Sequence, residues 1–181
     1  NGKESLVDLF DGRSQLIVQH FMFGPDWTEG CPSCSFWADN FDNVIVHLNQ
    51  RDISMVFVSR SKLQNLEAYK ERMAWTFKWV SSLDSDFNFD FDVSFSSEAS
   101  GDGMNYNFGT VQFGGEEAPG TSVFYKDEDG TIYHTYSTYA RGLDMLNSAY
   151  HLMDLVPKGR DEDNLPFSMS WLRRHDSYDR N

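Results

Sequence analysis

Between residues 15 and 73, nearly continuous apolar runs alternate with segments whose apolar residues recur at helical spacing. Residues 15–23 and 53–59 are the apolar runs, as expected for strands that are covered on both faces. Residues 32–48 and 63–73 carry apolar side chains three and four positions apart, the spacing of one helix face. This strand–helix–strand–helix order predicts an α/β fold in which right-handed crossovers join parallel central strands.

Other segments are assigned by shorter signals. Residues 6–10 read as a short strand that ends at a turn. Residues 85–95 alternate between apolar and polar side chains, which predicts a strand with one solvent-exposed face. Ser61 and Gln64 have the spacing of a capping box, which predicts the start of the helix in residues 63–73.

The second half of the chain is expected to complete the sheet. Residues 122–126 and 131–137 flank a Gly-containing turn, which predicts a β-hairpin. Residues 143–156 carry a further helical stripe, which ends before Pro157. We expect one domain over residues 1–181, with an irregular insertion near 96–117 and a C-terminal extension over 158–181 that lays a short helix back on the body.

Only two cysteines are present, and they lie three positions apart as Cys31 and Cys34. A disulfide between them would close a very small loop and would constrain little of the unfolded chain, so stabilisation is a poor reason for the pair. Pro32 suits the first position of a helix, where its missing N–H is not needed. The pair therefore follows a buried strand and a loop, and it opens a helix.

This placement predicts reactive thiols. Unpaired amides and the dipole at a helix N-terminus favour an anion, and thiol pKa values at such positions fall to about 3.5–7.5. Cys31 is therefore the predicted attacking thiolate, and Cys34, one turn further along the same face, is the predicted resolving thiol. The alternative is that both thiols are packing residues in the core.

The sequence gives little indication of a metal site or of a polyanionic partner. A structural zinc site needs four ligands at matched spacing, and the five histidines are scattered. The acidic alternation near residue 88 lacks the glycine and glutamate of a calcium loop, because Phe89 and Phe95 stand in those positions. We therefore expect no metal and no cofactor. A net charge of −13 disfavours nucleic acid and anionic membranes as partners.

Two features of the sequence bear on the cellular compartment: its apolar runs and its first residue. No apolar run approaches the roughly 20 residues that a membrane-spanning helix needs. The sequence begins with Asn1 instead of methionine, which suggests trimming and leaves a lost signal peptide open. A cytoplasmic protein is the expectation, and a homodimer is left open.

Three segments carry a family resemblance: GCPSCSFWADNF at 30–41, FDFDVSF at 89–95 and YSTYARGLD at 136–144. In these the chain resembles the thioredoxin superfamily, and in particular an uncharacterised, domain-of-unknown-function family of bacterial thioredoxin-like proteins related to peroxiredoxins. The resemblance covers most of the chain from residue 6. It implies a thioredoxin-like fold, a central mixed sheet with helices on both faces, although a fold does not fix an activity.

The resemblance has two branches. Thioredoxins carry a cis-proline before the strand that faces the cysteine pair, and Pro119 is in the matching place. Peroxiredoxins carry a Pro-x-x-x-Thr-x-x-Cys motif, and the segment from Pro25 through Thr28 to Cys31 is similar but one residue short. Arg141 is a candidate for the arginine that peroxiredoxins use. Both branches make Cys31 the nucleophile.

The sequence therefore predicts a thiol–disulfide oxidoreductase that acts on a disulfide-bearing protein or a small thiol. One alternative is a peroxiredoxin-like thiol peroxidase that reduces a peroxide with Cys31. Another is a redox-inactive binding module with the same fold. Besides the two cysteines, the candidate substrate-binding residues are Trp27 in the loop before the pair, Thr28, Pro32, Pro119 and Arg141.

Overall fold

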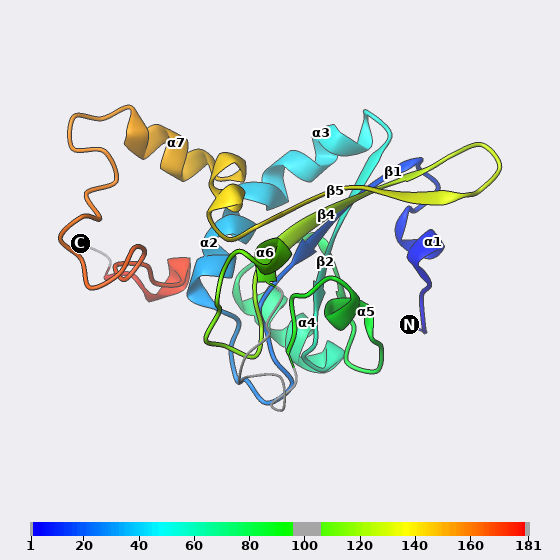
Figure 1. Ribbon diagram of the computed structural model, residues 1–181, viewed down its shortest axis with the longest axis horizontal. Helices are drawn as coiled ribbons and strands as arrows, with labels where there is room; N and C mark the ends of the chain where they lie inside the picture. Colours follow the sequence, from blue (N-terminus) through cyan, green and yellow to red (C-terminus); the bar gives the residue numbers. More distant parts are fainter. Residues whose placement is uncertain (1, 96–105, 180–181) are drawn as a thin grey trace.

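The computed structural model describes residues 2–95 and 106–179, and a five-stranded mixed sheet lies at its centre (Figure 1). The strand order is β3-β2-β1-β4-β5. β1 pairs in parallel with β2, and β2 with β3, whereas β4 is antiparallel to both β1 and β5. The strands are β1 (Gln15–His20), β2 (Ile53–Ser59), β3 (Lys78–Ser81), β4 (Gly120–Lys126) and β5 (Ile132–Tyr139).

Helices cover both faces of the sheet (Figure 1). On one face, α2 (Pro32–Phe41), α3 (Ile45–Asn49) and α4 (Leu63–Arg72) pack over an aromatic core that includes Phe21 and Phe57. On the other face, α1 (Leu6–Leu9) and α5 (Phe87–Asp90) cover a smaller cluster of aliphatic and phenylalanine side chains. The remaining helical elements are a 3-10 turn at Asp42–Val44, α6 (Tyr106–Gly109), a 3-10 helix at Ala140–Leu146, α7 (Ser148–Asp154) and a 3-10 turn at His175–Ser177.

The central prediction is confirmed: the fold is α/β, with parallel β1 and β2 joined through helices and a hairpin formed by β4 and β5. The predicted strand over residues 6–10 is wrong, because this segment is the helix α1. Its start is stabilised by the Asp8 carboxylate, which accepts hydrogen bonds from the Ser5 backbone N–H at 2.8 Å and the Ser5 hydroxyl at 2.6 Å. This local capping outweighs the apolar pattern.

The predicted strand over residues 85–95 is also wrong. Its core is the helical turn α5, and among the described residues its β-bridge to another segment is the one between Ser94 and Glu117. The apolar alternation misleads because Phe87 and Phe91 are four positions apart, so both rings also fit one face of a helical turn, and their centroids lie 4.9 Å apart. The third parallel strand is instead β3, which the sequence pattern did not identify.

Three further expectations change in detail. The α4 helix begins after Lys62 without a side-chain cap, so the predicted capping box of Ser61 and Gln64 does not form. The predicted helix over residues 143–156 is divided, because the Asn147 side chain accepts hydrogen bonds from two amides and starts α7 anew. Of the predicted insertion, residues 96–105 lie outside the described residues.

The C-terminal extension returns to the body largely without regular helix. Leu172 is buried, and Met169 and Trp171 pack against the main core. The segment therefore packs against the body, and where a short helix is expected it forms the 3-10 turn at 175–177. Within residues 2–95 and 106–179, no helix has the length and apolar character that crossing a bilayer requires.

His20 is a fully buried polar residue at the end of β1. Its Nε2 lies 2.9 Å from the Ser122 hydroxyl, and its Nδ1 has no partner among the described residues. Burial, with a smaller contribution from the nearby His134, lowers the pKa of His20 to about 3. The folded protein therefore holds this imidazole neutral, whereas the unfolded chain protonates it below about pH 6.5.

We expect His20 to make the fold acid-sensitive. Between about pH 6.5 and pH 3 the unfolded state binds up to one more proton than the folded state, so stability falls as the pH decreases through this range. Between pH 6 and pH 4, the wild-type free energy of unfolding should fall by roughly 2 kcal/mol more than that of His20→Gln. Denaturant titrations at several pH values measure this difference. The exposed His47→Gln is the control, and parallel wild-type and His20→Gln pH curves would contradict the prediction.

Candidate active site

The two cysteines lie where the chain leaves β1 and begins α2. Cys31 is the residue before the helix, with extended backbone angles, and Pro32 is the first helical residue, so the predicted helix start is confirmed. The Cys31 N–H donates to the carbonyl oxygen of Met22 at 3.1 Å. Ser35 donates both its N–H and its hydroxyl to the carbonyl oxygen of Cys31, at 3.0 and 2.9 Å. These bonds fix the backbone of Cys31 from both sides.

The two thiols have opposite electrostatic environments. Hydrogen bonds from the Cys34 side chain, from the backbone of Cys34 and Ser33 and from the Ser33 side chain outweigh burial and lower the pKa of Cys31 to about 7. Burial and the neighbouring Cys31 raise the pKa of Cys34 well above its ordinary value. Both cysteines are free thiols, Cys31 half-buried and Cys34 only 3% exposed. Near neutral pH, Cys31 can ionise while Cys34 retains its proton.

A cavity of about 420 Å³ adjoins Cys34. Most of its wall is apolar, and Pro119 and Arg141 contribute to it as well. Tyr106 braces this wall, because its hydroxyl donates to the carbonyl oxygen of Pro119 at 2.7 Å and accepts from the Ala140 N–H at 2.8 Å. The size and apolar lining suit a small molecule or one side chain of a larger partner.

Some of the predicted site residues line the cavity beside Cys34, and others do not. Cys34, Pro119 and Arg141 meet at the cavity, although every described peptide bond is trans, including the one before Pro119. Arg141 also pairs with Asp144 at 2.6 Å. Pro32 is the first residue of α2 and is absent from the cavity wall.

Trp27 and Thr28 are not part of the cavity wall either. The Trp27 ring lies against Gly24 and packs on the edge of the main core, which is a structural role. Thr28 is exposed, and within the described ranges its hydroxyl has no hydrogen bond that would connect it to Cys31. In the same ranges no three His, Cys, Asp or Glu side chains gather as metal ligands.

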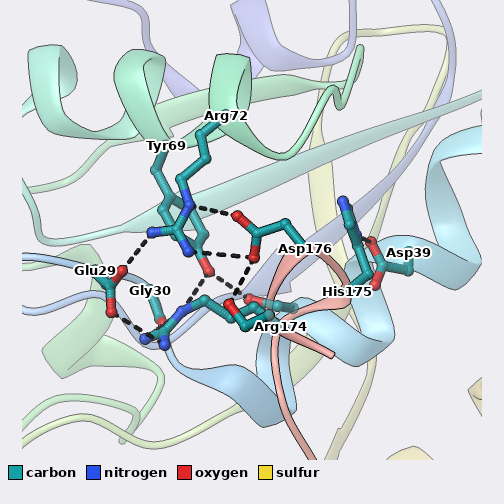
Figure 2. Close-up of polar contacts among 10 residues, drawn as sticks. Glu29, Gly30, Asp39, Tyr69, Arg72, Arg174, His175 and Asp176 are labelled. Atoms are coloured by element: carbon teal, nitrogen blue, oxygen red, sulfur yellow. Dashed lines mark hydrogen bonds and ion pairs between the residues drawn. The ribbon is translucent and has the colours of Figure 1, made fainter. Parts of the chain in front are cut away.

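Sequence reasoning missed a group of residues that surround the loop before Cys31 (Figure 2). The Arg174 guanidinium donates to the carbonyl oxygen of Gly30 at 2.7 Å and to the Tyr69 hydroxyl at 2.9 Å. Tyr69 in turn shares a hydrogen bond of 2.9 Å with Ser35. Arg174 is 144 positions from Gly30, so no spacing pattern could have indicated the contact.

Comparison with known proteins places the chain in a family. A family model described as "Bacterial protein of unknown function (DUF899)" matches residues 1–178. This agrees with the domain-of-unknown-function family that the sequence motifs indicated. No curated protein matches the chain in sequence.

Two solved structures show the fold. The bacterioferritin comigratory protein of Xanthomonas campestris has a TM-score of 0.51 at 14% identity, with 84% of this chain and 86% of that chain covered. The peroxidoxin BcpB of Mycobacterium tuberculosis has a TM-score of 0.50 at 13% identity, with 79% and 81% covered. The predicted thioredoxin-like fold, with its mixed sheet and helices on both faces, is confirmed.

Gly30 offers a test of how tightly the loop is packed. A Cβ at this position would lie 2.7 Å from the Phe21 ring and 2.8 Å from the Tyr69 ring, both core residues that cannot easily move. We therefore expect Gly30→Ala to lower the free energy of unfolding by about 1–3 kcal/mol. Gly114→Ala is the matched control, because nothing lies within 4 Å of its added Cβ. Equal stability of the two variants would show that the loop is loosely packed.

Proposed function

We propose that this chain, which belongs to the DUF899 family of bacterial proteins of unknown function, is a thiol–disulfide oxidoreductase that works through Cys31 and Cys34. The observation that carries the proposal is the contrast between the two thiols. Hydrogen bonds at the helix start lower the pKa of Cys31 to about 7, whereas burial raises that of Cys34. The thiolate is the attacking form in disulfide exchange, so Cys31 is suited to attack first.

The proposed cycle moves two electrons from the protein to the substrate. The Cys31 thiolate attacks one sulfur of a substrate disulfide, a mixed disulfide forms, and the other substrate sulfur leaves as a thiolate that takes up a proton. Cys34 then loses its proton and attacks the Cys31 sulfur. The Cys31–Cys34 disulfide forms as the mixed disulfide breaks, and the second substrate thiol is released. An external dithiol returns the pair to the reduced state.

The cavity beside Cys34 is the proposed place for an apolar part of the substrate. Pro119 and Arg141 lie in its wall, so they are the proposed substrate-binding residues, and Arg141 adds a positive charge to an otherwise apolar surface. Trp27, Thr28 and Pro32 flank the thiol pair in the sequence and stay candidates for contacts with the larger body of a protein substrate. A disulfide-bearing protein or a small thiol compound is the proposed partner.

A thiol peroxidase is the second candidate, and the fold supports it. The Xanthomonas protein of similar fold is described as having alkyl peroxide reduction activity. In this chain the reaction would transfer one peroxide oxygen to the Cys31 sulfur, giving a sulfenic acid and an alcohol or water. Cys34 would then condense with the sulfenic acid, with release of water and formation of the disulfide. Thr28 is the candidate partner of the peroxide.

Trapping the intermediate tests the oxidoreductase proposal. We expect reduced wild-type protein to reduce insulin disulfides with a dithiol donor, and Cys31→Ser to lose this activity. Cys34→Ser should retain the attacking thiolate but should be unable to release the product. It should therefore accumulate a covalent mixed disulfide with the substrate, visible as a dithiol-sensitive mass shift.

The two single-serine variants are controls for each other, because each removes one sulfur. Absence of mixed disulfide with Cys34→Ser would contradict attack by Cys31. Rapid consumption of hydrogen peroxide by the wild-type protein, together with no reduction of insulin, would favour the peroxidase. If the protein neither reduces insulin nor consumes hydrogen peroxide, the redox-inactive binding module is the candidate that is left.

A further inference from the structure

We infer that Arg174, in the C-terminal segment, is a positioning residue that holds the loop of Cys31 in the geometry of an attacking thiolate. This inference rests on the proposed function, because it assigns a role to Arg174 in that same site. The segment, red in Figure 1, comes back to the beginning of α2, and the close-up in Figure 2 places Arg174 between Glu29, Gly30 and Tyr69.

Arg174 contacts the residue that directly precedes Cys31. Its Nη2 and Nε donate to the carbonyl oxygen of Gly30, at 2.7 and 3.2 Å. The rings of Phe21 and Tyr69 pack against the Cα of Gly30 and leave no space for a side chain. Gly30 is therefore held by a rigid aromatic wall at its Cα and by a guanidinium at its carbonyl oxygen. Since the peptide that follows it leads into Cys31, this contact limits where the sulfur can lie.

A second route leads from Arg174 to Cys31 itself. Nε of Arg174 also donates to the Tyr69 hydroxyl at 2.9 Å, and that hydroxyl is 2.9 Å from the hydroxyl of Ser35. Ser35 donates to the carbonyl oxygen of Cys31. The guanidinium is thus hydrogen-bonded to one carbonyl directly and is connected to the next carbonyl through two hydroxyl groups. Its planar group of several donors suits this arrangement, which a lysine ammonium could reproduce only in part.

Charged neighbours hold Arg174 in place. Glu29 pairs with Arg174 at 3.0 Å and also with Arg72 of α4. Arg72 reaches on to Asp176 with bonds of 2.6 and 3.2 Å, and His175 lies 2.7 Å from Asp39 of α2. These pairs are partly exposed, so each contributes little stability alone. Together they connect the C-terminal segment to the thiol loop, to α2 and to α4.

Arg174 itself is mostly shielded from solvent, since only 19% of its side chain is exposed. Among the residues that the structure describes, its polar contacts are with a backbone oxygen, a hydroxyl and one carboxylate, and none is with a cysteine sulfur. The hydrogen bonds that stabilise the Cys31 thiolate come from Ser33 and Cys34. Arg174 therefore acts through the backbone, by keeping the sulfur within reach of those donors.

The test measures the pH dependence of Cys31 alkylation in the full chain. Iodoacetamide is the reagent, and peptide mass spectrometry assigns the modified cysteine. We expect Arg174→Ala to raise the midpoint of the Cys31 profile by about one pH unit, which lowers the thiolate fraction and the rate at pH 7 about five-fold. Arg173→Ala is the matched control, because the hydrogen bonds of Arg173 with described residues stay within its own segment, and its midpoint should equal that of wild type.

The conservative variant separates position from charge. Arg174→Lys keeps the charge, so a positioning role predicts that it restores the midpoint only in part. Full restoration by lysine would overturn the inference, as would an unchanged midpoint in a folded Arg174→Ala protein. Thermal unfolding and near-UV circular dichroism establish that the variants are folded.

If Arg174→Ala does not fold, Tyr69→Phe decides the matter, because it keeps the ring and removes the hydroxyl that connects Arg174 to Ser35. We expect a smaller shift in the same direction, and no shift would overturn the inference. An Arg174-dependent midpoint in a protein that reduces no disulfide would contradict the proposed function and would support the positioning role alone.

Discussion

The chemistry proposed for this protein depends on the hydrogen bonds that the first turn of α2 offers to the sulfur of Cys31. The side chain of Cys34 contributes most, and with the backbone of Cys34 and Ser33 and the side chain of Ser33 it lowers the pKa of that thiol to about 7 despite partial burial. A helix start has such donors because its first amides lack partners within the helix. Cys34 lies three residues further along in this turn and is only 3% exposed, and its thiol keeps its proton. The start of α2 therefore provides one ionisable thiol and one protonated thiol.

The fold supplies the fixed surroundings that this turn needs. β1 is a central strand, paired with β2 on one side and with β4 on the other, so the loop that leaves it begins from a rigid position. Pro119, directly before β4, and Arg141, in the 3-10 helix after β5, both lie in the wall of the cavity beside Cys34. The C-terminal segment contributes two residues to this region. Arg174 donates to the carbonyl oxygen of Gly30, and Met169 forms part of the cavity wall. Segments far apart in the sequence therefore meet at the loop before Cys31 and at the cavity beside Cys34.

The sequence predicts those parts of the structure that depend on local patterns. The apolar runs of β1 and β2, the helix start at Pro32 and the hairpin turn each follow from a few neighbouring residues. The pattern of residues 85–95 predicts the wrong element because phenylalanines four positions apart fit both a strand and a helix, and packing of their rings on the sheet favours the helix. The contact of Arg174 with Gly30 joins residues 144 positions apart, so it exists only in the folded chain. Thus the two cysteines of the candidate site can be proposed from local sequence, whereas the residues that hold their loop in place cannot.

The most direct test of the central claim is a titration of the thiolate absorbance near 240 nm in the reduced wild-type protein, with Cys31→Ser as reference. This account predicts one transition near pH 7 that disappears in Cys31→Ser. The Cys34 transition should lie well above pH 9. A single combined transition near pH 9, unchanged in position by the serine, would show that the helix start does not stabilise the Cys31 thiolate and would contradict the account.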